Sequence, residues 1–85
     1  MKPAFQVGDR VLMLRHADWK ADCTGTVTSP GRIRKGIRGE YMDYFIQFDE
    51  PQADLMDEMN GDFSRRYSGS TVAEEFLQPL DSLNE

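Results

Sequence analysis

The apolar residues of this chain come in short runs, and each run ends at glycine, proline or acidic residues. The clearest run covers residues 41–48 and is followed by Asp49-Glu50-Pro51. Its side chains alternate with a period of two, which is the pattern of a β-strand with one face in a core. The alternating residues are Tyr44, Ile46 and Phe48 on one side and Phe45 and Gln47 on the other.

Four further strands are predicted, each bounded by turn residues. They cover residues 10–15, 24–28, 65–67 and 76–80. Pro79 lacks the N–H group that a β-ladder uses, so the last strand is expected at an edge of the sheet. Residues 32–39 contain two glycines and four cations, and we predict an exposed loop or hairpin tip there.

Two short helical turns are predicted between these strands. The first lies in the acidic segment 52–62 and ends at Gly61; its apolar residues are Leu55, Met56 and Met59. The second follows from Thr71 and Glu74, which have the spacing of a capping box. This pattern predicts one helical turn from Thr71 to Glu75, directly before the last strand.

Five short strands with one helical turn before the last are typical of an SH3-like barrel. We therefore predict an all-β, five-stranded SH3-like barrel in a single domain, residues 1–85, with its core in residues 5–80 and a polar tail at 81–85. An OB-fold is the alternative, but it normally places a fuller helix between its third and fourth strands. Segment 52–62 has the composition for only a poor helix.

Three segments carry a resemblance to a known family. They are Phe-Gln-Val-Gly-Asp-Arg-Val at 5–11, Tyr-Phe-Ile-Gln-Phe-Asp at 44–49 and Glu-Glu-Phe-Leu-Gln-Pro-Leu at 74–80. Together they resemble the C-terminal domain of the nitrile hydratase β subunit. With Gly-Thr-Val at 25–27 as the second strand, the chain is also similar to the variable chain of ferredoxin–thioredoxin reductase, an accessory chain in electron transport. The resemblance implies an SH3-like accessory domain that docks on a larger protein and carries no catalytic residues.

Side chains that catalysis and metal binding require are scarce in this sequence. The chain has one histidine and one cysteine, His16 and Cys23, and no third group orients them as a nucleophilic pair needs. A zinc site needs three or four such ligands. Residues 31–36 begin like a phosphate-binding loop, but Ile37 and Arg38 stand where that motif has Lys and Ser/Thr. We predict a protein that is not an enzyme, with no metal site, no cofactor and no small-molecule substrate.

Composition and charge restrict the setting of the protein. The net charge is -5, and an acidic domain is a poor general nucleic-acid binder unless its cations cluster. A single cysteine allows no intrachain disulfide. The longest strongly apolar run, residues 11–14, is far below the ~20 residues of a membrane helix, and the first residues contain no apolar core of a signal peptide. We predict a cytoplasmic protein with no membrane contact.

Charges of opposite sign are separated along the chain. The stretch 32–38 holds four cations and no acid, whereas 49–62 holds six acids and no base. Three hypotheses follow: docking on a protein with an acidic surface, nucleic-acid binding through the same basic stretch, or ion pairing between the two stretches. Docking on a protein is preferred, with aromatic anchors beside the cations. The predicted partner-binding residues are Arg32, Arg34, Lys35, Arg38, Trp19 and Tyr41.

Overall fold

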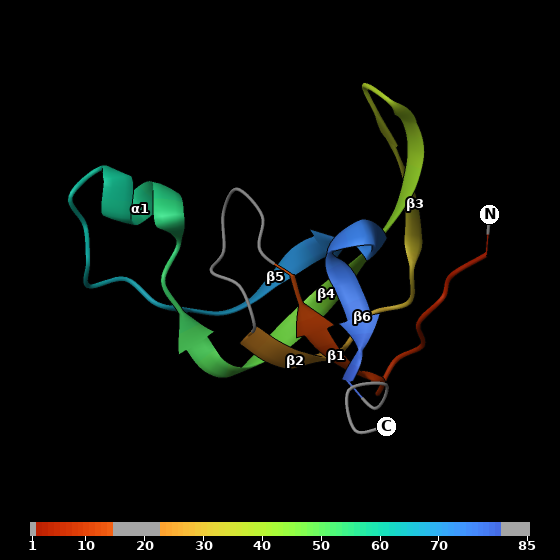
Figure 1. Cartoon of the computed structure of the whole chain (residues 1–85), viewed down its shortest axis with the longest axis horizontal. Coiled ribbons are helices and arrows are strands. Elements are labelled where there is room, and N and C mark those ends of the chain that lie inside the picture. Colours follow the sequence, from red (N-terminus) through yellow and green to blue (C-terminus); the bar gives the residue numbers. More distant parts are fainter. Residues whose placement is uncertain (1, 15–22, 81–85) are drawn as a thin grey trace.

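An antiparallel sheet that curls on itself forms the body of the protein (Figure 1). The computed structural model describes residues 2–14 and 23–80. Along the chain the elements are β1 (Arg10–Met13), β2 (Cys23–Val27), β3 (Arg32–Gly36), β4 (Gly39–Gln52), α1 (Leu55–Met59), β5 (Tyr67–Ala73), the 3₁₀ turn η1 (Glu74–Phe76) and β6 (Leu77–Pro79). The predicted all-β fold is confirmed. Within the described part of the chain, no helix is long and apolar enough to cross a membrane.

The strands pair in the order of a small SH3-like barrel. β1 pairs with β2, β2 with β4 and β4 with β5, and β6 returns after η1 to pair with the other edge of β1. The helical turn before the last strand is therefore present. β6 lies at an edge of the described sheet, as expected, and ends at Pro79. β3 is additional to the five predicted strands: of the loop or hairpin tip predicted for residues 32–39, the structure has the hairpin, in which residues 32–36 pair with the first part of β4.

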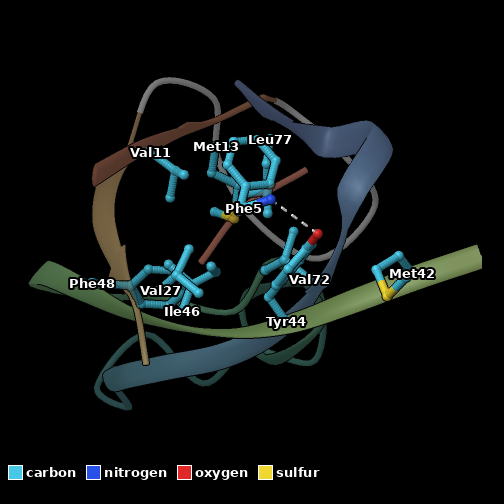
Figure 2. Close-up of a cluster of buried hydrophobic side chains, with 10 residues drawn as sticks. All are labelled: Phe5, Val11, Met13, Val27, Met42, Tyr44, Ile46, Phe48, Val72 and Leu77. Carbon is cyan, nitrogen blue, oxygen red and sulfur yellow. Dashed lines mark hydrogen bonds between the residues drawn. The ribbon is translucent and has the colours of Figure 1, made fainter. Parts of the chain in front are cut away.

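The core lies between the curled faces of the sheet and is built from alternate residues of β4 with its neighbours (Figure 2). Among the described residues, ten hydrophobic side chains are buried in it: Phe5, Val11, Met13, Val27, Met42, Tyr44, Ile46, Phe48, Val72 and Leu77. Tyr44 is fully buried, and its ring meets that of Phe5 edge to face at 5.5 Å. The Tyr44 hydroxyl accepts hydrogen bonds from the N–H groups of Ala4 (3.0 Å) and Phe5 (3.3 Å) and donates to Glu74 Oε2 (2.8 Å). This hydroxyl joins the N-terminal segment and η1 to the core.

The helical turn in the acidic segment is confirmed as α1. The Asp54 carboxylate caps it by accepting from the Met56 N–H at 2.7 Å, and Gly61 follows it with a φ of +88°. None of its residues is buried. Met56 and Met59 are exposed, so the apolar face that the spacing predicts does not enter the core.

The predicted capping box at Thr71 is wrong. Thr71 lies inside β5, and the helical turn begins only at Glu74, after Ala73, whose side chain makes no capping hydrogen bond. The reason is tertiary: Val72 pairs with Tyr44 and is buried in the core. Burying a valine contributes about 1.5–3 kcal/mol, which exceeds the ~1 kcal/mol of a helix cap. The strand predicted at 65–67 accordingly starts only at Tyr67 and continues to Ala73.

Candidate functional site on the β3–β4 hairpin

The basic stretch forms a β-hairpin that stands away from the barrel (Figure 1). β3 pairs with the start of β4 from Arg32↔Asp43 to Gly36↔Gly39, and Ile37 and Arg38 make the turn. Gly39 closes this turn with a φ of +111°, a conformation that favours glycine. All five residues of β3 are exposed. The hairpin, residues 32–43, thus forms an arm outside the core, and this arm carries the four predicted cations.

Two of the four predicted docking cations are engaged within the arm itself. Arg34 Nε lies 3.1 Å from Asp43 Oδ2, and Arg32 Nε lies 4.0 Å from Asp43 Oδ1. Asp43 is only 4 % exposed, although it sits on a strand face where Phe45 and Tyr41 reach solvent. A buried carboxylate needs a counter-charge, and these arginines supply it. Arg32 and Arg34 therefore stabilise the hairpin, whatever else they contact.

Two cations remain at the tip of the hairpin. Lys35 and Arg38 make no ion pair with any residue that the structure describes. Ile37 stands between them in the sequence and is fully exposed, with a relative accessibility of 106 %, and Ile33 on the same arm is 51 % exposed. A large apolar side chain bracketed by two unpaired cations therefore forms the outermost point of the arm.

Tyr41 flanks these residues and joins the two strands of the arm. It pairs with Arg34 across the ladder, and its ring lies so close to Gly36 that an added Cβ there would come within 3.1 Å of it. The ring is 41 % exposed. The structure thus brings Tyr41 together with the four predicted cations, whereas Trp19 lies outside the described residues, as does His16.

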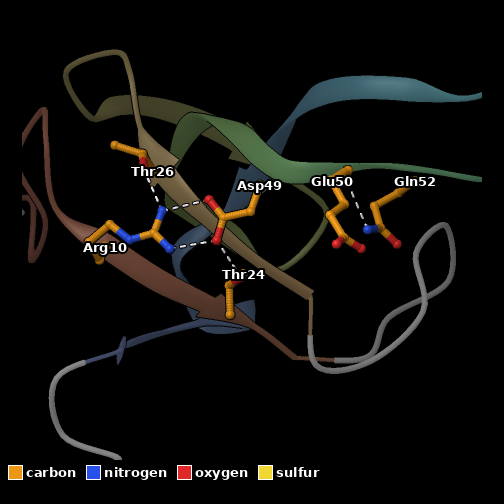
Figure 3. Close-up of polar contacts among 6 residues, drawn as sticks. All are labelled: Arg10, Thr24, Thr26, Asp49, Glu50 and Gln52. Carbon is orange, nitrogen blue, oxygen red and sulfur yellow. Dashed lines mark hydrogen bonds and ion pairs between the residues drawn. The ribbon is translucent and has the colours of Figure 1, made fainter.

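The acidic segment makes its own contacts, and Figure 3 shows those of Asp49 with Arg10 and Thr24. Asp49 accepts two hydrogen bonds from the Arg10 guanidinium, at 2.6 and 2.5 Å, and a third from the Thr24 hydroxyl. The guanidinium, and secondarily Thr24, lower the pKa of Asp49 to about 2. Asp57 accepts from the Tyr67 hydroxyl at 2.7 Å. Among the described residues the basic hairpin and segment 49–62 share no ion pair, so the internal pairing that does form uses Asp43 instead.

A groove of about 600 Å³ opens between the hairpin and η1. The hairpin contributes one wall, from Gly36 to Met42, and Ala73, Glu74 and Glu75 contribute the other. Glu74 is held in place by the Tyr44 hydroxyl at 2.8 Å. The charged residues that line the groove are three acids, Glu40, Glu74 and Glu75, and one base, Arg38. The groove is thus acidic, although it adjoins a basic tip.

Cys23 begins β2 and lies half-buried against the core. Within ranges 2–14 and 23–80, no group of three or more His, Cys, Asp or Glu side chains is placed to hold a metal ion.

The comparisons with known proteins give no relative for this chain: no family model, no curated protein and no solved structure matches it.

Sequence reasoning missed three features of this site. The burial of Asp43 depends on the register between β3 and β4, which local sequence does not fix. The groove depends on where β5 ends, and the capping-box pattern gave the wrong end. Ile37 could have been noticed, because an isoleucine between glycine and arginine at a predicted hairpin tip has no core to enter.

Proposed function

We propose that this protein is a non-catalytic binding module that docks on a partner protein through the tip of the β3–β4 hairpin. The observation that carries this proposal is the fully exposed Ile37 between Lys35 and Arg38, two cations that form no ion pair with the described part of the chain. Burying an isoleucine side chain contributes about 1.5–3 kcal/mol, so a pocket on a partner would gain this amount from Ile37. The two cations fit an acidic rim around such a pocket and would steer the approach.

The distribution of charge favours a protein over a nucleic acid as the partner. Only two cations of the arm are unpaired among the described residues, and three acids line the groove beside it. Phosphate binding draws its affinity from several cations that neutralise the backbone together. An accessory role is also what the resemblance of residues 5–80 to the nitrile hydratase β-subunit domain implies.

A site-specific photocrosslink tests the proposal. A benzophenone amino acid at position 37 should crosslink to a protein in living cells, and the same group at the exposed Phe63 serves as the position control. Reversing the tip charges with Lys35→Glu and Arg38→Glu should reduce the position-37 adduct at least tenfold. The matched control, Arg65→Glu with Arg66→Glu, changes the net charge equally and should leave the adduct intact.

Two outcomes would contradict the proposal. Equal loss in both charge-reversal variants would show that only net charge matters. An adduct at position 37 that nuclease removes would assign the tip to RNA or DNA, and a steep salt dependence in a direct titration would confirm that assignment. Urea unfolding of each variant verifies that the comparison is between folded proteins.

A further inference from the structure

Part of one edge of β4, beside the groove, has no neighbouring strand among those described. β5 pairs with this edge only from Gln52↔Tyr67 to Asp43↔Ala73, and after Ala73 the chain leaves the sheet as η1. The first part of β4, Gly39 to Met42, has β3 on its other side. Among the described strands none lies along its β5 side. The groove of about 600 Å³ is lined by this same stretch of β4.

The register shows which backbone groups face this edge. Phe45 directs its N–H to Ser29 Oγ (2.9 Å) and its C=O to the Thr28 N–H (2.9 Å), on the side of β2 and β3. Successive residues of a strand direct their N–H and C=O groups to alternate sides. The backbone N–H and C=O groups of Glu40 and Met42 therefore point to the opposite side of β4, toward the groove. The N–H and C=O of Glu40 and the N–H of Met42 have no hydrogen-bond partner there among the described residues.

We propose that this groove binds an extended segment of a partner protein, which adds as a strand to the free edge of β4 and carries lysine or arginine side chains. Strand addition uses unpaired backbone groups of this kind for affinity and alternate side chains for specificity. The open stretch of four residues is about 13 Å long, enough for a short strand. The occupant is basic because Glu40, Glu74 and Glu75 outnumber the single base, Arg38, along the groove.

Two further features favour this edge over the outer edge of β3. The outer edge carries Arg32, Arg34 and Lys35, and charged side chains on an edge strand discourage pairing with another chain. In the groove, the Tyr44 hydroxyl holds Glu74 before any partner arrives, which lowers the cost of ordering that carboxylate on binding. This site goes beyond the proposed docking tip, and either can fail without the other.

The probe is a fluorescein-labelled peptide, Lys-Val-Lys-Thr-Lys-Val, compared with Glu-Val-Glu-Thr-Glu-Val. We expect the lysine peptide to bind at least tenfold more tightly by fluorescence anisotropy, and to shift the backbone amide resonances of Glu40 and Met42. Two more peptides carry N-methyl groups on either the odd or the even residues. Because an added strand directs only alternate N–H groups at β4, one of these peptides should lose at least tenfold in affinity and the other should bind nearly as before.

A pair of proline variants locates the edge. Glu40→Pro removes an N–H that faces the groove, and Lys35→Pro removes the corresponding N–H on the outer edge of β3. The two residues form a non-hydrogen-bonded pair of the β3–β4 ladder, so neither change takes a bond from that ladder. Binding should fall at least tenfold in Glu40→Pro and persist in Lys35→Pro. The reverse result would move the site to β3 and overturn the proposal.

The peptide titrations use the wild-type protein, so they test the proposal even if a proline variant fails to fold. Equal losses from both methylated peptides would exclude strand addition, and no binding at millimolar lysine peptide would exclude the site. The tip variant Lys35→Glu should retain the peptide, because Lys35 is not among the residues that line the groove. Loss of the photocrosslink with retention of the peptide, or the opposite, therefore shows which proposal has failed.

Discussion

Replacing Arg34 by methionine tests whether the arm of the hairpin is held by its ion pairs. Methionine keeps an apolar stem of similar length and removes only the guanidinium, which lies 3.1 Å from the buried Asp43. Breaking a fully buried ion pair costs about 3–5 kcal/mol, whereas an exposed pair contributes about 0–1 kcal/mol. The Arg34 side chain is 47 % exposed and Arg32 remains near the other carboxylate oxygen, so we expect a loss of about 1–2 kcal/mol.

Urea unfolding and thermal melting measure this loss directly. For a domain of this size it corresponds to a fall in Tm of roughly 4–16 °C. Lys35→Met is the matched control, because Lys35 lies next on the same strand and has no ion pair among the described residues. Its free energy of unfolding should stay within about 0.5 kcal/mol of wild type. Asp43→Asn added to Arg34→Met should restore part of the loss, because a neutral amide needs no counter-charge.

Equal stability of Arg34→Met and Lys35→Met would refute this reasoning. The Arg34–Asp43 pair would then contribute nothing measurable to folding. Arg34 would return to the set of cations available to a partner, as the sequence alone predicts. A double-mutant cycle with no coupling between Arg34 and Asp43 would lead to the same conclusion.

Two further predictions concern contacts that close the barrel. Tyr44→Phe should lower the free energy of unfolding by about 1–3 kcal/mol in urea, because the buried Phe5 N–H loses its acceptor; an effect below about 0.5 kcal/mol would contradict the hydrogen bonds at this hydroxyl. Asp49 has its pKa lowered to about 2 in the folded protein, so the stability it contributes is present above its unfolded value near 4 and is lost as pH falls through 2. The difference in urea midpoint between wild type and Asp49→Asn should therefore be constant from pH 7 to 5 and shrink between pH 4 and 2, and a difference that stays constant throughout would contradict the Arg10 pairing.

The parts of the fold that sequence predicts are those in which local pattern and core burial agree. In β4 the period of two places Tyr44, Ile46 and Phe48 inside, as expected. The turn α1 also forms where its spacing indicates, because Asp54 caps it locally. In both cases residues within a few positions of one another contain all the information needed.

The parts that sequence does not predict depend on contacts between distant residues. β3 has no apolar period, since its residues are held by the ladder to β4 and by Asp43, not by a core. Val72 overrides a plausible helix cap at Thr71 by pairing with Tyr44, nearly thirty residues away in the sequence. The cations of the basic stretch were expected to bind a partner or to pair with segment 49–62. Only the β3–β4 register shows that two of them, Arg32 and Arg34, form ion pairs with Asp43.

The buried Asp43 also links the stability of the arm to its proposed uses. An isolated two-stranded hairpin is marginally stable in water, and Met42 is the one arm residue beyond the turn with an apolar side chain in the core. Besides the β3–β4 backbone ladder, the contacts that order the arm are the ion pairs of Arg32 and Arg34 with Asp43 and the packing of the Tyr41 ring against Gly36. A stiff arm presents Ile37 and the edge at Glu40 in fixed positions, so less order is lost when a partner binds. Arg34→Met should therefore weaken both the position-37 crosslink and the lysine-peptide affinity, although Arg34 touches neither site, and unchanged binding would show that the arm is equally ordered without its ion pairs.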